Sequence, residues 1–310
     1  MTLFWFLCAL LPPVLYSISN LVDQYIARDH LQGAPFAFLA LSGLSNLPVL
    51  VGVGFFALAN PQVFDVDVIL YSSLAAIFFF LGMIPYFLVI AKNDVAHMMP
   101  VYQTVPFFLG ILCWVFLHEI LTIWQILGGV ITILAAIFST LELKKLKISV
   151  IPLILIFLSC WAYAFDILFM RLAALSAVWY VVTFWLCATW FLLAVGMILF
   201  FPAIRQHVIR VITYQRGRLF GLVAFQQVWD IGAGAATAAA LAFPVATTVT
   251  ILVGSIHPFV LLFFSFLAAR LIPSIYTFTL TRRDVLYKIA CFALMMAGLA
   301  LVVGVDVRAF

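Results

Sequence analysis

Charged residues are scarce in this sequence. Asp, Glu, Lys and Arg make up only 8% of its 310 residues, whereas a soluble domain has roughly 25%. Polar segments long enough to form a soluble domain are also missing, and 67% of the chain is hydrophobic. This balance excludes a soluble globular protein and indicates an integral membrane protein. The net charge of +4 does not indicate nucleic-acid binding, because the basic residues lie in short loops beside apolar segments.

Motifs of nucleotide, nucleophile and metal chemistry are absent as well. The chain has no Walker A motif, no G-x-S-x-G motif and no Cys/His cluster with metal-ligand spacing. The sequence "HEILT" at 118–122 lacks the second histidine of a zinc-protease motif, because Thr122 occupies that position. The sequence "GAGAAT" at 232–237 lies inside an apolar segment with no preceding strand, unlike a dinucleotide-binding motif. We therefore expect no cofactor and no metal site.

Apolar segments long enough to cross a membrane recur along the chain. A helix needs roughly 20 apolar residues to cross about 30 Å of hydrocarbon. The sequence predicts ten such spans, at 3–25, 35–58, 68–91, 95–117, 121–141, 149–170, 176–202, 219–242, 245–268 and 286–305. The first has no basic region before it and is too long for the apolar core of a signal peptide, so we take it as a span. The expected fold class is an all-α integral membrane protein with ten transmembrane helices.

Basic residues are distributed unevenly between the two sets of loops. Of the 15 Lys and Arg residues, thirteen follow odd-numbered spans, and only Arg171 and Arg308 lie on the other side. Positive charge near short loops is retained on the cytoplasmic side of the cell membrane. We therefore expect both termini to lie outside the cytoplasm.

Two segments far apart in the chain share a pattern that suggests an internal repeat. The sequences "SNLVDQYIAR" at 19–28 and "AYAFDILFMR" at 162–171 both end in D-x4-R, and they align Asp23 with Asp166. These segments end spans one and six. The alignment predicts that span six begins a second copy of the unit that starts with span one.

A second correspondence between spans four and nine supports the repeat. The sequence "VPFFLGILCWVFLHE" at 105–119 is similar to "HPFVLLFFSFLAARL" at 257–271, with Pro106 over Pro258. Because the unit has five spans, an odd number, the second copy must cross the membrane in the opposite direction, as in many secondary transporters. We expect two inverted five-helix repeats, at 1–143 and 144–310.

The segment "AKNDVAHMMPVYQTVPFFLGILCWVFLHEILTIWQILGGVITILAAIF" at 91–138 resembles the EamA repeat of the drug/metabolite transporter superfamily. The shared features are an apolar helix with a central proline, then Glu119, Gln125 and Gly128 in the next span. The resemblance extends over both halves and implies a transporter. The second half departs from the pattern, because Ala, Arg and Leu at 269–271 stand where the family has its glutamate. The known members keep their termini in the cytoplasm, whereas the charge distribution here predicts the reverse.

Polar residues form stripes along several spans, because residues three and four apart share a helix face. The stripes are Tyr16, Asn20 and Asp23 in span one; Ser159, Tyr163 and Asp166 in span six; Gln226, Gln227, Asp230, Gly234 and Thr237 in span eight; His97, Gln103 and Pro106 in span four; and Thr247, Thr250, Gly254 and His257 in span nine. Spans five and ten have small residues instead, which suit close helix packing. We expect the stripes to face a central cavity and spans five and ten to be structural.

Asp230 is the main candidate for a functional residue. It lies near the middle of span eight, where an ionised carboxylate costs about 2.5–3.5 kcal/mol. We expect it, with its neighbour Trp229, to line the cavity and to bind the solute or the coupling proton. A protonated, structural aspartic acid is the alternative. The other candidates for substrate or proton binding are Gln226, Gln227, His97, Gln103, His257, Asn20 and Tyr163.

Asp23 and Asp166 are candidate gate residues. They lie nearer the span ends, and the inversion predicts that roughly a membrane thickness separates them. Either they close the two mouths of a central cavity, or they are ordinary capping groups at the membrane interface. The D-x4-R spacing spans about 140° around a helix, which disfavours a salt bridge within each helix. We therefore expect Arg28 and Arg171 to anchor the span ends at the interface.

These features predict a secondary active transporter rather than an enzyme. It would move a small organic metabolite, neutral, zwitterionic or cationic, by alternating access. Because no ATP-binding motif is present, a gradient must drive transport, and carboxylates and histidines favour a proton. The expected partners are the small-molecule substrate, membrane lipid and a proton. The alternatives are a flippase for a lipid-linked headgroup, a non-transporting membrane scaffold or sensor, and an intramembrane enzyme that uses Asp230 with His97 or His257.

Overall fold

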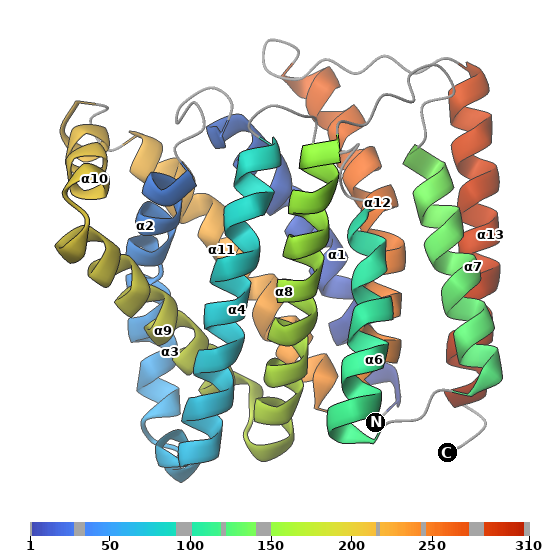
Figure 1. Ribbon diagram of the computed structural model, residues 1–310, viewed down its shortest axis with the longest axis horizontal. Helices are drawn as coiled ribbons and strands as arrows, with labels where there is room; N and C mark the ends of the chain where they lie inside the picture. Colours follow the sequence, from blue (N-terminus) through green and yellow to red (C-terminus); the bar gives the residue numbers. More distant parts are fainter. Residues whose placement is uncertain are drawn as a thin grey trace.

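The protein is a bundle of helices (Figure 1). A computed structural model describes residues 2–27, 35–90, 101–118, 122–140, 150–214, 218–242, 246–272 and 282–306. Within these ranges the chain is almost entirely helical and has no β-strand. The predicted all-α class is therefore confirmed for the described residues.

Most of the helices lie roughly along the vertical direction of Figure 1, and the start of α1 and the end of α13 lie at the same, lower end. The α-helices are α1 (Thr2–Tyr25), α2 (Pro35–Ser45), α3 (Leu47–Ala57), α4 (Val66–Ile90), α6 (Val105–Leu117), α7 (Ile123–Thr140), α8 (Val150–Ser176), α9 (Trp179–Phe200), α10 (Pro202–Tyr214), α11 (Arg218–Leu241), α12 (Ala246–Leu271) and α13 (Arg282–Asp306). Two short 3-10 helices, η2 (Pro61–Phe64) and η3 (Val101–Thr104), precede α4 and α6.

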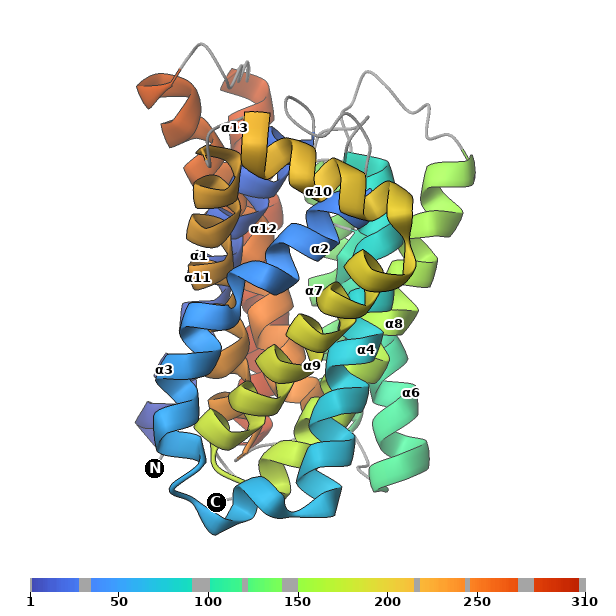
Figure 2. The ribbon, with the colours of Figure 1, turned by 90° about the vertical axis from the view of Figure 1, so that its left-hand side faces the viewer.

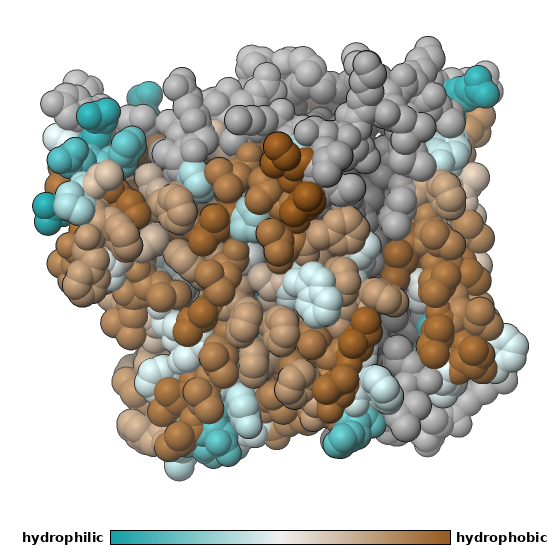
Figure 3. All heavy atoms as spheres, in the orientation of Figure 1, coloured by the Kyte–Doolittle hydropathy of each residue, from teal (hydrophilic) through white to brown (hydrophobic). Residues whose placement is uncertain are grey.

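The surface and the helix lengths suit a membrane. Among the described residues, three helices are long and apolar enough to cross it: α4, α9 and the part of α8 from Ile154 to Ser176. A fourth is added if α2 and α3 form one bent span. Phe55 and Phe200 are 80% and 81% exposed, which lipid accommodates better than water. Figure 3 shows apolar side chains over most of one face, with hydrophilic ones at its upper left and lower margin. The structure fits a membrane-embedded, multi-pass protein.

The segment at 35–58, which the sequence predicts as one span, forms two helices, α2 and α3, with a bend between them. The two helices meet at an angle of about 40°. Asn46 separates them, and Pro48 lies in the first turn of α3. Proline has no N–H to donate to the preceding turn, and its ring crowds the carbonyl there, so a continuous helix is disfavoured. The break leaves Asn46 inside the protein, where it is 3% exposed.

Helix α10 lies in the segment that the sequence predicts as a loop between spans seven and eight. Figure 2 shows it crossing the upper end of the bundle. Val208 and Val211, three residues apart, are buried, whereas Arg205 and Arg210 are exposed. This spacing gives the helix one apolar face toward the bundle and one basic face. The loop is thus corrected to an amphipathic helix.

A ring of seven helices encloses the middle of the molecule. Each helix of the ring packs on the next in the order α1, α11, α9, α4, α8, α6 and α12, and α12 returns to α1. The bent pair of α2 and α3 packs on α9. At Gly43 in α2 an added Cβ would come within 2.4 Å of the Cβ of Ala194 and 2.7 Å of Cδ1 of Trp190. Glycine therefore lets α2 lie directly against α9.

Helices α7 and α13 pack against each other beside the ring, at the right of Figure 1. Ala135 and Met295 are fully buried between helices. A Cβ at Gly298 would lie 2.5 Å from Oγ1 of Thr132 and 2.7 Å from the carbonyl oxygen of Gly128. This close approach confirms the prediction that small residues in spans five and ten serve helix packing.

Candidate functional site

Two adjoining cavities lie within the ring. The larger, of about 170 Å³, is lined by residues of α1, α4, η3, α6, α8, α11 and α12. The smaller, of about 70 Å³, is lined by residues of α1, α4, α8, α9 and α11 and by Asn46 at the α2–α3 break. The residues that line both are Tyr16, Phe79, Asp166, Met170 and Asp230. Because the cavities share these walls, we treat them as one site.

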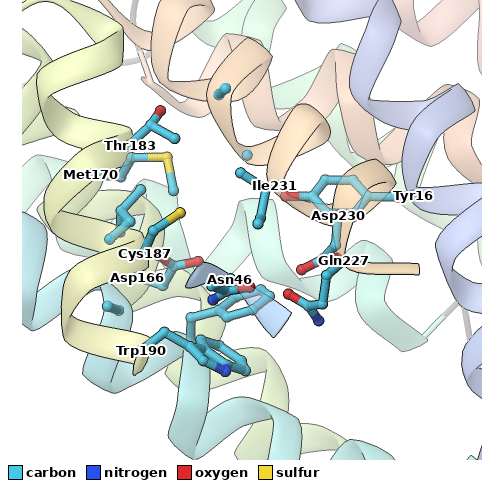
Figure 4. Close-up of a pocket in the computed structure, with 15 residues that line it drawn as sticks. Tyr16, Asn46, Asp166, Met170, Thr183, Cys187, Trp190, Gln227, Asp230 and Ile231 are labelled. Atoms are coloured by element: carbon cyan, nitrogen blue, oxygen red, sulfur yellow. The ribbon is translucent and has the colours of Figure 1, made fainter. Parts of the chain in front are cut away.

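Asp166 and Asp230 face each other across the smaller cavity. Figure 4 shows Asp166 on α8 at one side, and Asp230 with Gln227 on α11 at the other. The two helices pack on different neighbours, α8 on α4 and α11 on α1. The site therefore lies between two tightly packed helix pairs.

A series of hydrogen bonds ends on the carboxylate of Asp230. Gln227 Nε2 donates to Gln226 Oε1 at 2.8 Å, and Gln226 Nε2 donates to Ser19 Oγ at 2.7 Å. Ser19 Oγ then donates to Asp230 Oδ1 at 3.4 Å. Both glutamines are buried. Because every donor in the series points the same way, the bonds polarise one another toward the carboxylate. The series joins α1 to α11 and holds Asp230 at the cavity wall.

A second network joins α1, α4 and α12 at the larger cavity. Tyr86 donates its hydroxyl proton to Asn20 Oδ1 at 3.2 Å, and Asn20 Nδ2 lies 3.2 Å from His257 Nε2. An amide nitrogen cannot accept a hydrogen bond. In this arrangement His257 Nε2 therefore accepts, and a neutral ring carries its proton on Nδ1. The ring of Tyr16 lies 6.2 Å from that of His257.

Asp23 and Asp166 line the same cavity. The expectation that roughly a membrane thickness separates them is therefore wrong. Their side chains are 1% and 5% exposed, and within the described residues Oδ1 of each has no hydrogen-bond partner. A buried carboxylate oxygen without a donor is costly unless a ligand, proton or water satisfies it. Their role as gate residues stays a prediction.

Arg171 does not anchor a span end at the interface, contrary to expectation. It is 7% exposed, and its Nη1 donates to the carbonyl oxygen of Leu241, the last residue of α11. The final carbonyls of a helix have no partner within the helix, so a cation there completes the end of α11. Arg171 ties α8 to α11. Arg28 lies outside the described residues.

Five aromatic side chains run along both cavities and form what we call the aromatic wall. The ring centroids follow one another at 6.0 Å from Tyr86 to Tyr102, 5.6 Å to Tyr163, 5.4 Å to Phe79 and 5.0 Å to Trp190. Tyr86, Tyr102, Tyr163 and Phe79 line the larger cavity, and Phe79 and Trp190 line the smaller. The wall thus links the two cavities.

The structure brings together most of the residues that the sequence predicted for the site. Asn20, Asp23, Tyr163, Asp166, Asp230 and His257 line the larger cavity, and Gln227 lines the smaller. Gln226 lies behind them in the hydrogen-bonded series.

The other predicted site residues are Trp229, His97 and Gln103. Trp229 lies against Phe225, with ring centroids 5.8 Å apart, and is not among the residues described as lining these two cavities. The tryptophan at the wall is Trp190 instead. His97 lies outside the described residues, and Gln103 lies in η3 with its side chain outside the described part.

Other residues of the site were missed from sequence. Tyr86 and Trp190 lie in strongly apolar spans, where no polar stripe marks them. Ser19 and Tyr102 are next to the predicted residues Asn20 and Gln103 in the sequence, so the polar stripes could have indicated them. Asn46 precedes a proline by two residues, and this spacing indicates a helix break.

Comparisons with known proteins give a fold but no family. No protein-family model matches the chain, and no curated protein matches it. A solved structure described only as "Crystal structure of protein" matches with a TM-score of 0.60 at 15% sequence identity. The match covers 98% of this chain and 97% of the other. At this identity the likeness extends to the fold alone, over the full length of both chains.

Proposed function

We propose that this protein is a secondary active transporter of the drug/metabolite transporter type, similar to EamA proteins, that moves a small organic metabolite by alternating access. The observation that carries the proposal is the cavity lined by residues of two helix pairs, α1–α11 and α4–α8. A site formed by helices from both halves of the chain can open to either side if the halves rock against each other. A proton gradient drives the movement, because the buried carboxylates offer places for a proton.

Ten membrane crossings in two inverted repeats are part of the proposal. The first repeat contains α1, the bent pair α2–α3, α4, α6 and α7, and the second contains α8, α9, α11, α12 and α13. Taken in order along the chain, α1 corresponds to α8 and α4 to α11. In Figure 1 α1 runs upward from the lower end of the bundle and α8 runs downward, as inversion requires.

The packing of the helices supports this correspondence. If each helix is replaced by its counterpart in the other half, the α1–α11 contact becomes α8–α4 and the α1–α12 contact becomes α8–α6. In the same way the α2–α11 contact becomes α9–α4. All of these pairs are in contact. The α7–α13, α6–α12 and α3–α9 contacts exchange into themselves. Such a pattern is expected of a pseudo-two-fold axis between two halves.

Uptake into proteoliposomes tests the proposed function. Purified protein should take up a panel of small amines, amino acids and neutral metabolites faster than empty liposomes, and an imposed pH gradient should accelerate at least one solute. Absence of protein-dependent uptake for every solute would favour a membrane scaffold or sensor. Movement confined to lipid-linked substrates would favour a flippase instead.

A further inference from the structure

The described cavity walls carry three carboxylates and one histidine, His257, whose ring is neutral when its Nε2 accepts from Asn20. Asp23, Asp166 and Asp230 line the site, and none of its described lining residues is lysine or arginine. Arg171 follows the lining residue Met170 in α8, and its Nη1 donates to the carbonyl oxygen of Leu241 at the end of α11. The described part of the chain has no group of three His, Cys, Asp or Glu side chains that could hold a metal ion.

Four hydroxyl donors at the site are already used by protein acceptors. Tyr86 donates to Asn20, and Tyr163 donates to the sulfur of Met83 at 2.8 Å. Ser159 donates to the carbonyl of Gly82 at 2.6 Å. The 2.8 Å contact between Tyr102 and Ser159 must therefore use the proton of Tyr102, because a serine hydroxyl has one proton.

Unused acceptors remain at the site. Asp23 Oδ1 and Asp166 Oδ1 have no partner among the described residues, and the three tyrosine hydroxyl protons are already donated. A ligand that donates hydrogen bonds or carries positive charge matches these walls. An anionic ligand would meet carboxylates in a low-dielectric site, where like charges repel strongly.

The aromatic wall adds a second, independent preference. Tyr86, Tyr102 and Tyr163 line the larger cavity, and their hydroxyl protons are donated to protein acceptors. Ring faces attract cations, and clusters of them recognise quaternary ammonium groups. Phe79 and Trp190 extend this surface into the smaller cavity. Aromatic rings and carboxylates thus border the same space.

We propose that the site binds an organic cation, an amine or quaternary ammonium group attached to a small apolar body. This inference rests on the proposed function, because it names the substrate class of the same cavity. A volume of about 170 Å³ holds on the order of ten water molecules, and so a ligand with a similar number of non-hydrogen atoms. The ammonium group lies near Asp166 and Asp230, which border both cavities, and the apolar body lies along the aromatic wall.

Ligand binding to the purified protein tests the charge preference directly. The probes are phenethylamine and benzyltrimethylammonium, which are cations, phenethyl alcohol, which is neutral, and phenylacetate, which is an anion. The two cations should raise the melting temperature and give measurable affinities by calorimetry, while the neutral and anionic probes should not. Benzyltrimethylammonium has no N–H group, so its binding isolates the effect of charge from hydrogen bonding.

Asp166→Asn provides the matched variant, because it removes the charge and keeps the size. It should weaken the binding of benzyltrimethylammonium by about tenfold or more, as expected for loss of a charged partner. The control is Asp67→Asn, since Asp67 is exposed in the first turn of α4. If Asp166→Asn does not fold, Asp230→Asn makes the same comparison, because Asp230 also borders both cavities.

The outcomes separate this inference from the transport proposal. The inference is overturned if phenethyl alcohol stabilises the protein as much as the cations do, or if neither cation binds at millimolar concentration. It is also overturned if the folded aspartate variant binds the cations with unchanged affinity. Cation binding without flux in proteoliposomes supports it while contradicting transport. Flux of neutral or anionic solutes by a protein that binds no cation contradicts it while supporting transport.

Discussion

At the scale of single residues, Asp230 depends on neighbours that belong to another helix. Ser19 in α1 donates to it, and Gln226 holds Ser19 in place. The sequence places Asp230 in the middle of an apolar span and so indicates that it is unusual. The partner on α1 is known only from the fold, because Ser19 and Asp230 are 211 positions apart.

Asp230→Asn tests whether the carboxylate does more than accept a hydrogen bond. Asparagine keeps the size and an oxygen acceptor for Ser19, so the melting temperature should change little. Gradient-driven uptake should fall by about tenfold or more, because a charged partner at a buried site is worth about 1.5–3 kcal/mol. Asp67→Asn is the control and should transport normally. Normal uptake by Asp230→Asn with unchanged pH dependence would mean that Asp230 is a structural hydrogen-bonding group.

At the scale of helices, glycine decides how closely elements pack. Gly43 brings α2 against α9, and Gly298 brings α13 against α7. The sequence showed small residues in spans five and ten, and from these the close pairing could be predicted. It did not show which helix pairs with which, because any two spans with small residues are possible partners. The α2–α3 break could have been read from Asn46 and Pro48, whose chemistry is local.

Gly298→Ala and Gly196→Ala form a matched pair for testing the close helix contact. A Cβ at Gly298 would meet the backbone oxygen of Gly128 at 2.7 Å, whereas at Gly196 nothing lies within 4 Å. Gly298→Ala should destabilise the protein by about 1–3 kcal/mol through overpacking, and Gly196→Ala should be neutral or slightly stabilising. Thermal unfolding in detergent, followed by tryptophan fluorescence, measures both. Equal melting temperatures for the two variants would contradict the close α7–α13 contact.

At the scale of the whole molecule, the distribution of basic residues along the sequence bears on its orientation in the membrane. Thirteen of the 15 Lys and Arg residues follow the predicted odd-numbered spans, and the start of α1 and the end of α13 lie at the same end of the bundle (Figure 1). The positive-inside rule therefore predicts that both termini lie outside the cytoplasm. The proposed inverted repeat would look alike from both sides of the membrane, so it would not by itself favour one orientation.

Cysteine labelling in whole cells tests this orientation. Gln62→Cys, in η2, should react with a membrane-impermeant maleimide added outside, and Lys145→Cys should react only after the membrane is permeabilised. The wild-type protein is the control for background, since four of its five cysteines are buried. The reverse pattern, with position 145 labelled from outside, would show that the charge distribution misleads here.

Properties that depend on local chemistry were determined by the sequence alone. The scarcity of charge and the length of the apolar segments indicate a membrane-embedded helical protein, because a helix of about 20 apolar residues crosses the lipid and satisfies its own backbone hydrogen bonds there. The polar stripes at Asn20, Asp166, Asp230 and His257 follow from the 3.6-residue period of the helix. Each stripe marks which face of its own helix avoids lipid.

The tertiary structure decided how those stripes meet. It brought Asp23 and Asp166 to one cavity, although the repeat suggested opposite mouths, because helix depth and tilt depend on packing partners rather than on position in a span. It also placed Trp190 rather than Trp229 at the wall and turned Arg171 toward the end of α11. Each of these outcomes joins residues from different helices, and the periodicity of one helix carries no information about its neighbours.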